Sequence, residues 1–138
     1  MEFRRNGTQI GSITQSGTTG VAYNTSSDYR LKENVSYDFD ATSRLKQLKP
    51  ARFNFIDDKD ITVDGFIAHE VSNIVPEAIN GEKDGTETYL DDKDKEQTRP
   101  VYQGIDQSKL VPLLVKSLQE AIAEIDTLKT KVAALESK

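Results

Sequence analysis

The chain has 138 residues, of which 36% are hydrophobic and 30% charged, and its formal net charge is −5. This length fits one domain with appendages, and the acidic charge excludes a general nucleic-acid binder, since such proteins neutralise phosphates with lysine and arginine. The absence of cysteine excludes disulfides, iron–sulfur clusters and thiolate zinc sites. No stretch approaches the roughly 20 apolar residues that cross a bilayer, so no secretory signal or membrane contact is expected.

Residues 1–26 hold four of the eight glycines, spaced among threonine, serine, asparagine and isolated apolar residues. This pattern favours short β-strands separated by glycine turns. Strands with so few apolar side chains cannot bury a face alone, so we expect them to pair with other chains or with a preceding domain. A flexible linker is the alternative interpretation.

Two short elements are predicted after this segment. A Thr-Ser start, two leucines three residues apart and a stop at Pro50 predict a short helix over residues 42–50. The alternation of Phe53 and Phe55 with polar neighbours then predicts a strand over residues 51–56.

The middle of the chain mixes turn signals with charge. The Asp64–Gly65 pair predicts a tight turn with strand on either side, and the apolar spacing of residues 69–79 predicts one or two helical turns. Residues 81–99 are highly charged and predict an exposed loop or hairpin, because a charge run is usually a solvated surface. A calcium loop is the lesser alternative, but the acidic spacing of an EF-hand is missing, so no metal site is predicted.

The last segment carries the clearest periodicity. From residue 114 onwards, apolar residues alternate at steps of four and three, as the seam of a coiled coil requires. The residues at its a and d positions favour a coiled coil of two helices. An amphipathic helix packed on its own domain is the alternative to self-association. The seam consists of Leu114, Leu118, Ala121, Ile125, Leu128, Val132 and Leu135.

Ser27 is a candidate nucleophile, because it lies five residues before Lys32 at the point where the glycine-rich segment ends. A serine–lysine pair is a known variant of the nucleophile–base arrangement. A lysine serves as a base only where burial or neighbouring cations, such as Arg30, lower its pKa towards neutrality. By spacing alone the signal is weak, and an ordinary turn is the favoured interpretation.

Three motifs, in order along residues 26–122, add a family resemblance. The stretch SSDYRLKENV resembles the opening Ser-Asp-x-x-x-Lys-Glu-Asn motif of the intramolecular chaperone auto-processing domain. This domain ends phage endosialidases, tail spikes, tail fibres and neck appendages, and occurs in the myelin regulatory factor. DGFIAHEV resembles a second motif, with His69 where glutamine is usual, and VYQGIDQSKLVPLLVKSLQEAI resembles the helical ending.

The resemblance implies a trimeric folding module that cuts itself off. Cleavage would fall at the bond between Ser26 and Ser27, with Ser27 as nucleophile and Lys32 as the group that moves its proton. No metal or other cofactor is implied. Asp28 and Glu33 would orient the lysine or cap the turn, and Arg30 and Asn34 are further candidate supporting residues.

The expected fold is α+β. It has a short β-stem over residues 1–26, a small mixed core over residues 27–110, and a long C-terminal helix over residues 111–138 in a parallel trimeric coiled coil. The expected partners are two further copies of the chain (a homotrimer) and the upstream β-stem of its own polypeptide, with no nucleic acid and no membrane.

The resemblance places the chain in a tail fibre or tail spike precursor of a virion. Such a precursor is assembled in the host cytoplasm, and the module is released after cleavage. A trimeric fibre tip that registers the stem or binds a receptor without cleaving is the alternative. A transcription-factor module, as in the myelin regulatory factor, is a further one.

Overall fold

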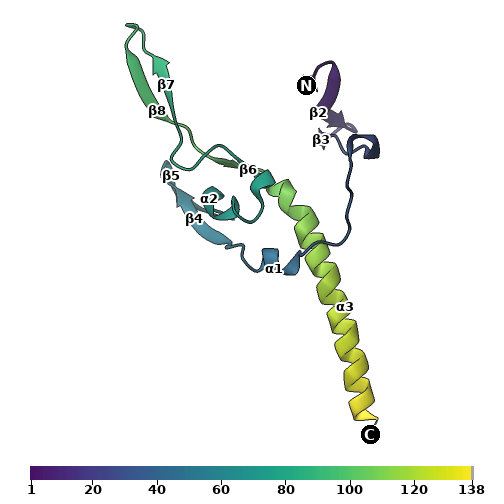
Figure 1. Cartoon of the computed structure of the whole chain (residues 1–138). Coiled ribbons are helices and arrows are strands. Elements are labelled where there is room, and N and C mark those ends of the chain that lie inside the picture. Colours follow the sequence, from purple (N-terminus) through teal and green to yellow (C-terminus); the bar gives the residue numbers. More distant parts are fainter. Residues whose placement is uncertain (138) are drawn as a thin grey trace. The chain divides into compact units, whose positions relative to one another are not determined.

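A computed structural model describes residues 1–137, which divide into two compact units (Figure 1). The first unit comprises Met1–Phe39 and the second begins at Asp40. The predicted division at the candidate cleavage site therefore falls inside the first unit. The chain is a mixed α and β structure with small antiparallel sheets and a long C-terminal helix, as the sequence predicts.

The first unit is built on a three-stranded antiparallel sheet of order β1-β2-β3, which confirms the predicted strands and replaces the linker interpretation. Asn6 and Gly7, with φ of 49° and 81°, connect the first two strands, and such left-handed pairs suit the twist of a hairpin. A single turn of 3-10 helix follows the sheet. The elements are β1 (Glu2–Arg5), β2 (Thr8–Ser16), β3 (Gly20–Thr25) and η1 (Tyr29–Leu31).

This sheet has no packed apolar face within its own unit. Phe3, Val21 and Tyr23 are 48%, 60% and 80% exposed, and Ser12 is the buried residue of the sheet. A sheet of three strands needs a hydrophobic face covered by another layer to be stable alone. The sheet therefore leaves apolar side chains uncovered within its own unit, and its pairing with other chains or with a preceding domain stays a prediction.

The second unit joins three two-stranded sheets and several short helical turns to one long helix (Figure 1). The strand pairs are β4 with β5, β6 with β9, and β7 with β8. The elements are α1 (Thr42–Leu45), β4 (Ala51–Phe55), β5 (Asp58–Gly65), α2 (Ala68–Val71), η2 (Pro76–Ala78), β6 (Ile79–Asn80), β7 (Thr86–Leu90), β8 (Glu96–Pro100), β9 (Gly104–Ile105), η3 (Gln107–Leu110) and α3 (Val111–Glu136).

A small hydrophobic core holds the second unit together where α2 and η2 meet the start of α3. The predicted helical elements contribute side chains to this core from residues 42–50 and 69–79. Both predictions are confirmed, although the helices are shorter than expected. The buried members are Ala41, Val71, Val75, Ala78, Leu110 and Leu113.

The predicted strand over residues 51–56 is confirmed as β4, but the predicted turn at Asp64–Gly65 is wrong. Both residues lie in β5 and pair with the first residues of β4, and the hairpin turns at residues 56–57 instead. The Asp64 carboxylate lies 2.7 Å from the Arg52 guanidinium across the hairpin, which favours aspartate in the strand. A Cβ at Gly65 would lie 3.2 Å from the Phe53 ring, so glycine allows close packing here.

The charged segment forms an exposed antiparallel hairpin of β7 and β8, as one of the predicted alternatives has it (Figure 1). Asp91 orders its tip by accepting hydrogen bonds from the backbone amides of Lys93 and Lys95, at 2.9 Å and 3.1 Å. Along the strands, Arg99 lies 2.6 Å from Glu87. The hairpin is thus held by polar contacts.

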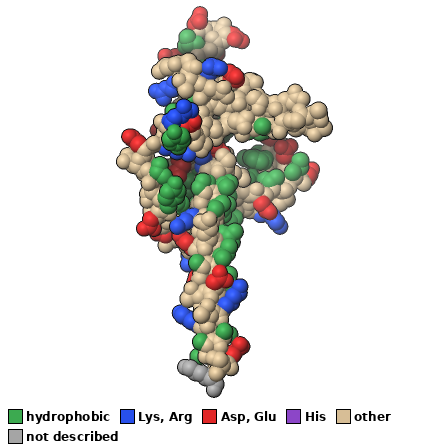
Figure 2. All heavy atoms as spheres, turned by 90° about the vertical axis from the view of Figure 1, so that its right-hand side faces the viewer, with side chains coloured by type: hydrophobic (Ala, Val, Ile, Leu, Met, Phe, Trp, Pro, Cys, Tyr) green, Lys and Arg blue, Asp and Glu red, His purple; other side chains and the backbone are tan. Residues whose placement is uncertain are grey.

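Helix α3 has 26 residues and packs on the core only through its beginning. From residue 121 to residue 137 every residue is exposed, and the large side chains of the predicted seam are 49% to 68% exposed. Figure 2 shows hydrophobic side chains along this helix, mixed with charged ones towards its C-terminal end. The predicted helix is confirmed, and the trimeric coiled coil stays a prediction. Among residues 1–137, no helix has the length and apolar character needed to cross a membrane.

Candidate active site

Ser26 is anchored to the sheet of the first unit just after β3 ends. Its backbone amide donates a hydrogen bond to the carbonyl of Ile10 at 3.2 Å. Its hydroxyl donates to the carbonyl of Gln9 at 3.1 Å. The residue that would carry the attacked carbonyl is therefore fixed against β2, and the chain is free to turn only after it.

The turn η1 then brings Lys32 back onto Ser27. Asp28 caps this turn, because its carboxylate accepts from the amide of Arg30 at 2.9 Å and its carbonyl accepts from the amide of Leu31 at 3.1 Å. The amide of Lys32 donates to the carbonyl of Tyr29 at 3.1 Å. As a result, the amine Nζ of Lys32 lies 2.8 Å from the hydroxyl Oγ of Ser27, within reach of proton transfer.

Arg30 pairs with Asp28 through two parallel contacts. Its Nε and Nη2 donate to the two carboxylate oxygens at 2.9 Å and 2.8 Å. The Arg30 side chain and then its backbone amide, as donors, hold the pKa of Asp28 below its ordinary value, and the carboxylate in turn raises the pKa of Arg30. The guanidinium charge is therefore largely compensated by Asp28, and the pair stiffens the turn that holds Lys32.

This pair gives a pH prediction with a defined sign. Because the folded chain lowers the pKa of Asp28, the pair stabilises the turn at pH values above the ordinary carboxyl range and loses this effect as pH falls through the folded-state pKa. Arg30→Gln should move the titration midpoint of the Asp28 carboxyl upwards, measured by NMR in a Ser27→Ala background that keeps the chain whole.

Asp64 provides the internal control for this titration. Its pKa is lowered by Arg52, in the second unit, so its midpoint should not move when Arg30 is replaced. An unchanged Asp28 midpoint would show that the Asp28–Arg30 pair does not form in solution.

Glu33 and Asn34 form no hydrogen bond with Ser27 or Lys32 within the described residues. Within residues 1–137 the Glu33 carboxylate forms no hydrogen bond or ion pair, so the structure brings it to neither member of the dyad. Asn34 adopts φ of 53°, a left-handed conformation that asparagine tolerates better than most residues. It therefore redirects the chain directly after the turn.

The whole segment from Ser27 to Phe39 is exposed in the single chain. Its apolar side chains are included, with Tyr29 82%, Leu31 64% and Tyr37 85% exposed. Water therefore has access to Ser27 and Lys32 in the isolated chain. The geometry of a nucleophile–base pair is present, whereas the dry surroundings that strengthen such a pair would have to come from another surface.

His69 and the acidic residues form no metal-binding group in the part of the chain that is described. His69 lies exposed on α2, in the second unit, where its carbonyl accepts a hydrogen bond from Ser72. No group of three or more histidine, aspartate or glutamate side chains in residues 1–137 is arranged to hold a metal ion.

The anchoring of Ser26 by Gln9 and Ile10 is the part of the site that the sequence does not reveal. The Ser26 hydroxyl and the Gln9 carbonyl are 17 positions apart in the chain. Their contact depends on the register of β2 with β3, which pairs Gly11 with Thr25. No local pattern encodes that register.

Comparison with known families gives one match. Residues 27–80 match the family model Peptidase_S74, described as chaperone of endosialidase. The match covers less than half of the chain, begins at the candidate nucleophile and ends in β6. It confirms the family resemblance that the sequence motifs indicate. A comparison with curated proteins finds no match.

Proposed function

Because residues 27–80 match the family model described as chaperone of endosialidase, we propose that this chain is an intramolecular chaperone that assembles as a homotrimer and then cuts its own backbone between Ser26 and Ser27. The observation that carries the proposal is the 2.8 Å contact between Lys32 Nζ and Ser27 Oγ, one residue beyond the anchored Ser26. The reaction is a single-turnover serine–lysine cleavage without cofactor.

In the proposed reaction, neutral Lys32 takes the hydroxyl proton of Ser27 while Oγ attacks the carbonyl carbon of Ser26 through a small ring. The carbon–nitrogen bond then breaks. Lys32 returns the proton to the departing α-amine of Ser27, and an ester joins the Ser26 carbonyl to Oγ. Water hydrolyses this ester, leaving a carboxylate on Ser26 and restoring the hydroxyl of Ser27.

Assembly supplies what the single chain lacks. The ammonium of a lysine in water is charged, and desolvation favours the neutral amine that the reaction needs. The exposed apolar side chains of residues 27–39 support the proposal that a partner surface covers this segment. Cleavage would then follow assembly rather than precede it.

The chaperone activity is the registration of three β-stems. Chains that pair their strands lose entropy on association before any stabilising contact forms. Chains already joined through α3 have a high effective concentration, which lowers this cost. The open sheet of β1, β2 and β3 is the kind of segment that such registration would complete. Loss of the chaperone after cleavage would leave the stem kinetically trapped.

We place the parent protein among phage tail fibres or spikes. It would assemble in the host cytoplasm and release this module after the cut. The partners are two copies of the chain and the upstream stem. A fibre tip that trimerises but stays attached is the second candidate, favoured by the water-exposed position of the dyad in the single chain.

The test follows the order of the two events. Chains made in a short pulse of cell-free synthesis are sampled over time on native and denaturing gels. The proposal expects a full-length trimer first and a fragment of residues 27–138 afterwards. A trimer that stays at full length would establish the non-cleaving tip, and cleavage of chains that never assemble would contradict the coupling.

A further inference from the structure

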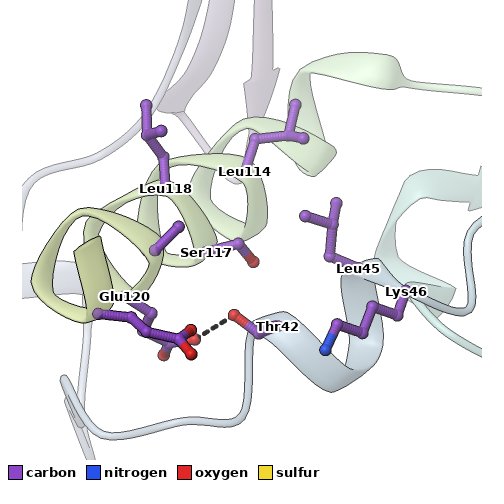
Figure 3. Close-up of a pocket in the computed structure, with 9 residues that line it drawn as sticks. Thr42, Leu45, Lys46, Leu114, Ser117, Leu118 and Glu120 are labelled. Atoms are coloured by element: carbon purple, nitrogen blue, oxygen red, sulfur yellow. Dashed lines mark hydrogen bonds between the residues drawn. The ribbon is translucent and has the colours of Figure 1, made fainter. Parts of the chain in front are cut away.

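The groove between α1 and α3 is an apolar cavity that its own chain does not fill. It has a volume of about 790 Å³. Leu45 forms the α1 side, and Leu114, Ser117 and Leu118 form the α3 side (Figure 3). In Figure 3, the side chains of Leu45, Leu114 and Leu118 extend towards the same side of the two helices. An occupant would therefore meet leucine from both.

One edge of the groove is held by a hydrogen bond between its two helices, and one polar group lies in its wall. The hydroxyl of Thr42 donates a hydrogen bond to the Glu120 carboxylate, which ties α1 to α3 (Figure 3). The hydroxyl of Ser117 is buried and has no hydrogen-bond partner within residues 1–137. Leu114, Leu118 and Ala121 are both groove residues and seam residues, so the groove continues the predicted seam.

The heptad positions predict which side chain of a neighbouring helix would reach this groove. With Leu118 at an a position, Ser117 occupies g and Ile122 occupies e. In parallel coiled coils the g residue of one helix lies beside the next e residue of its neighbour. Ile122 is 49% exposed in the single chain. A parallel, in-register neighbour would therefore place its Ile122 against Ser117, in the groove.

The same g-to-e rule pairs residues of opposite charge in the C-terminal part of α3. There, Glu124 at g meets Lys129 at e of the neighbour, and Lys131 at g meets Glu136 at e. All four side chains lie in the fully exposed part of α3. Within residues 1–137, Lys129 forms an ion pair with Asp126 of its own helix, an exposed pair of 3.4 Å that contributes little.

A shift of one heptad would reverse these matches. It would place Glu124 beside Glu136 in one direction and Lys131 beside Lys129 in the other, and like charges in contact disfavour association. Unlike a shift of one heptad, the in-register alignment pairs opposite charges towards the C-terminal end and places an apolar side chain at the apolar groove.

We infer that the α1–α3 groove is a docking site for Ile122 of a second copy of this chain, held parallel and in register by the Glu124–Lys129 and Lys131–Glu136 pairs. The interface then extends beyond the coiled coil to α1. This inference rests on the proposed self-assembly and adds its alignment and its contact surface.

Cross-linking tests the alignment, because the chain contains no cysteine of its own. Two variants carry Glu124→Cys with Lys129→Cys, and Lys131→Cys with Glu136→Cys, at exposed positions of α3 and in a Ser27→Ala background. Cysteines five residues apart on one helix point away from each other, so a short thiol cross-linker should join only different chains. Both variants should give covalent oligomers on a denaturing gel.

The control is Glu124→Cys with Glu136→Cys, which matches a shift of one heptad, about 10 Å along the helix. It should stay uncross-linked. An assembly by sedimentation that cross-links only in this control, or in none of the variants, would overturn the inference and leave the proposed assembly intact. Single chains by sedimentation would overturn both.

Charge reversal gives an independent readout. Glu124→Lys should weaken association at least about tenfold, because it places lysine beside Lys129 of the neighbour. Adding Lys129→Glu should restore most of the affinity. The control Asp126→Lys makes the same charge change outside e and g and should have little effect. Equal loss in all three variants would contradict the proposed pairing.

Discussion

Ser27→Ala should leave the chain at full length under conditions in which the unmodified chain is cut. Removing the hydroxyl removes the only nucleophile that lies 2.8 Å from a lysine amine at this position. Loss of an activated nucleophile typically lowers the rate by at least about 10³-fold. The change should therefore read as complete loss of the smaller fragment on a denaturing gel over many half-lives of the unmodified chain.

Lys32→Arg should have the same effect, because arginine keeps the positive charge but cannot give up its proton in a protein. This variant separates a role in proton transfer from a role in attracting negative charge. Lys32→Ala removes both, so equal loss in the two variants indicates that the neutral amine is what matters.

Ser26→Ala is the matched control for both replacements. It removes a serine hydroxyl from the adjacent position, where Oγ bonds the carbonyl of Gln9 and does not contact the lysine. The backbone anchor from the Ser26 amide to Ile10 remains. Cleavage should persist in this variant, because the residue loses its side-chain anchor but keeps its backbone position. Cleavage of Ser27→Ala at the ordinary rate would refute the assignment of the nucleophile.

Ile125→Asp should convert the assembly into single chains and thereby abolish cleavage. Ile125 lies in the middle of the exposed seam and is 49% exposed in the single chain. An aspartate there would place unpaired charges from several copies in an apolar interface, and such charges are costly to bury. We expect association to weaken at least about 100-fold by sedimentation.

Thr130→Asp is the control for this replacement. Thr130 lies on the side of α3 away from the seam, and its hydroxyl bonds the carbonyl of Asp126 within the helix. It should assemble and cleave as the unmodified chain does. If Ile125→Asp also stayed assembled, or fell apart yet was still cut, the proposed link between the seam and cleavage would be wrong.

Local patterns predict the elements of this chain whose structure is fixed by near neighbours. The heptad spacing is a pattern of nearby residues. The helix that it predicts is present as α3, from Val111 to Glu136. The polar, glycine-rich start likewise forms strands with turns such as Asn6–Gly7. In both cases the secondary structure follows from residues that are near neighbours in the chain.

The failed turn at Asp64–Gly65 shows where local patterns stop. The dipeptide is a good turn former, but Asp64 is held in β5 by Arg52, 12 positions away, and Gly65 faces the Phe53 ring. The turn forms instead at residues 56–57, which carry no such signal. Tertiary contacts outweigh the local preference here.

The candidate site divides in the same way. A spacing of five residues permits the contact between Lys32 and Ser27 but does not require it, and the family motif is what directs attention to it. The ion pair of Asp28 with Arg30 and the anchor of Ser26 on β2 are visible only in three dimensions. The cover that we propose for this exposed segment would come from the assembly, so the contacts of a single chain do not contain it.

The mass of the fragments formed by the unmodified chain tests the central proposal most directly. We predict two products whose intact masses place the new carboxyl terminus at Ser26 and the new amino terminus at Ser27, formed only in samples that sediment as an assembly. A cut at any other bond, or an assembled chain that keeps its full mass, would contradict self-cleavage by Ser27 and Lys32.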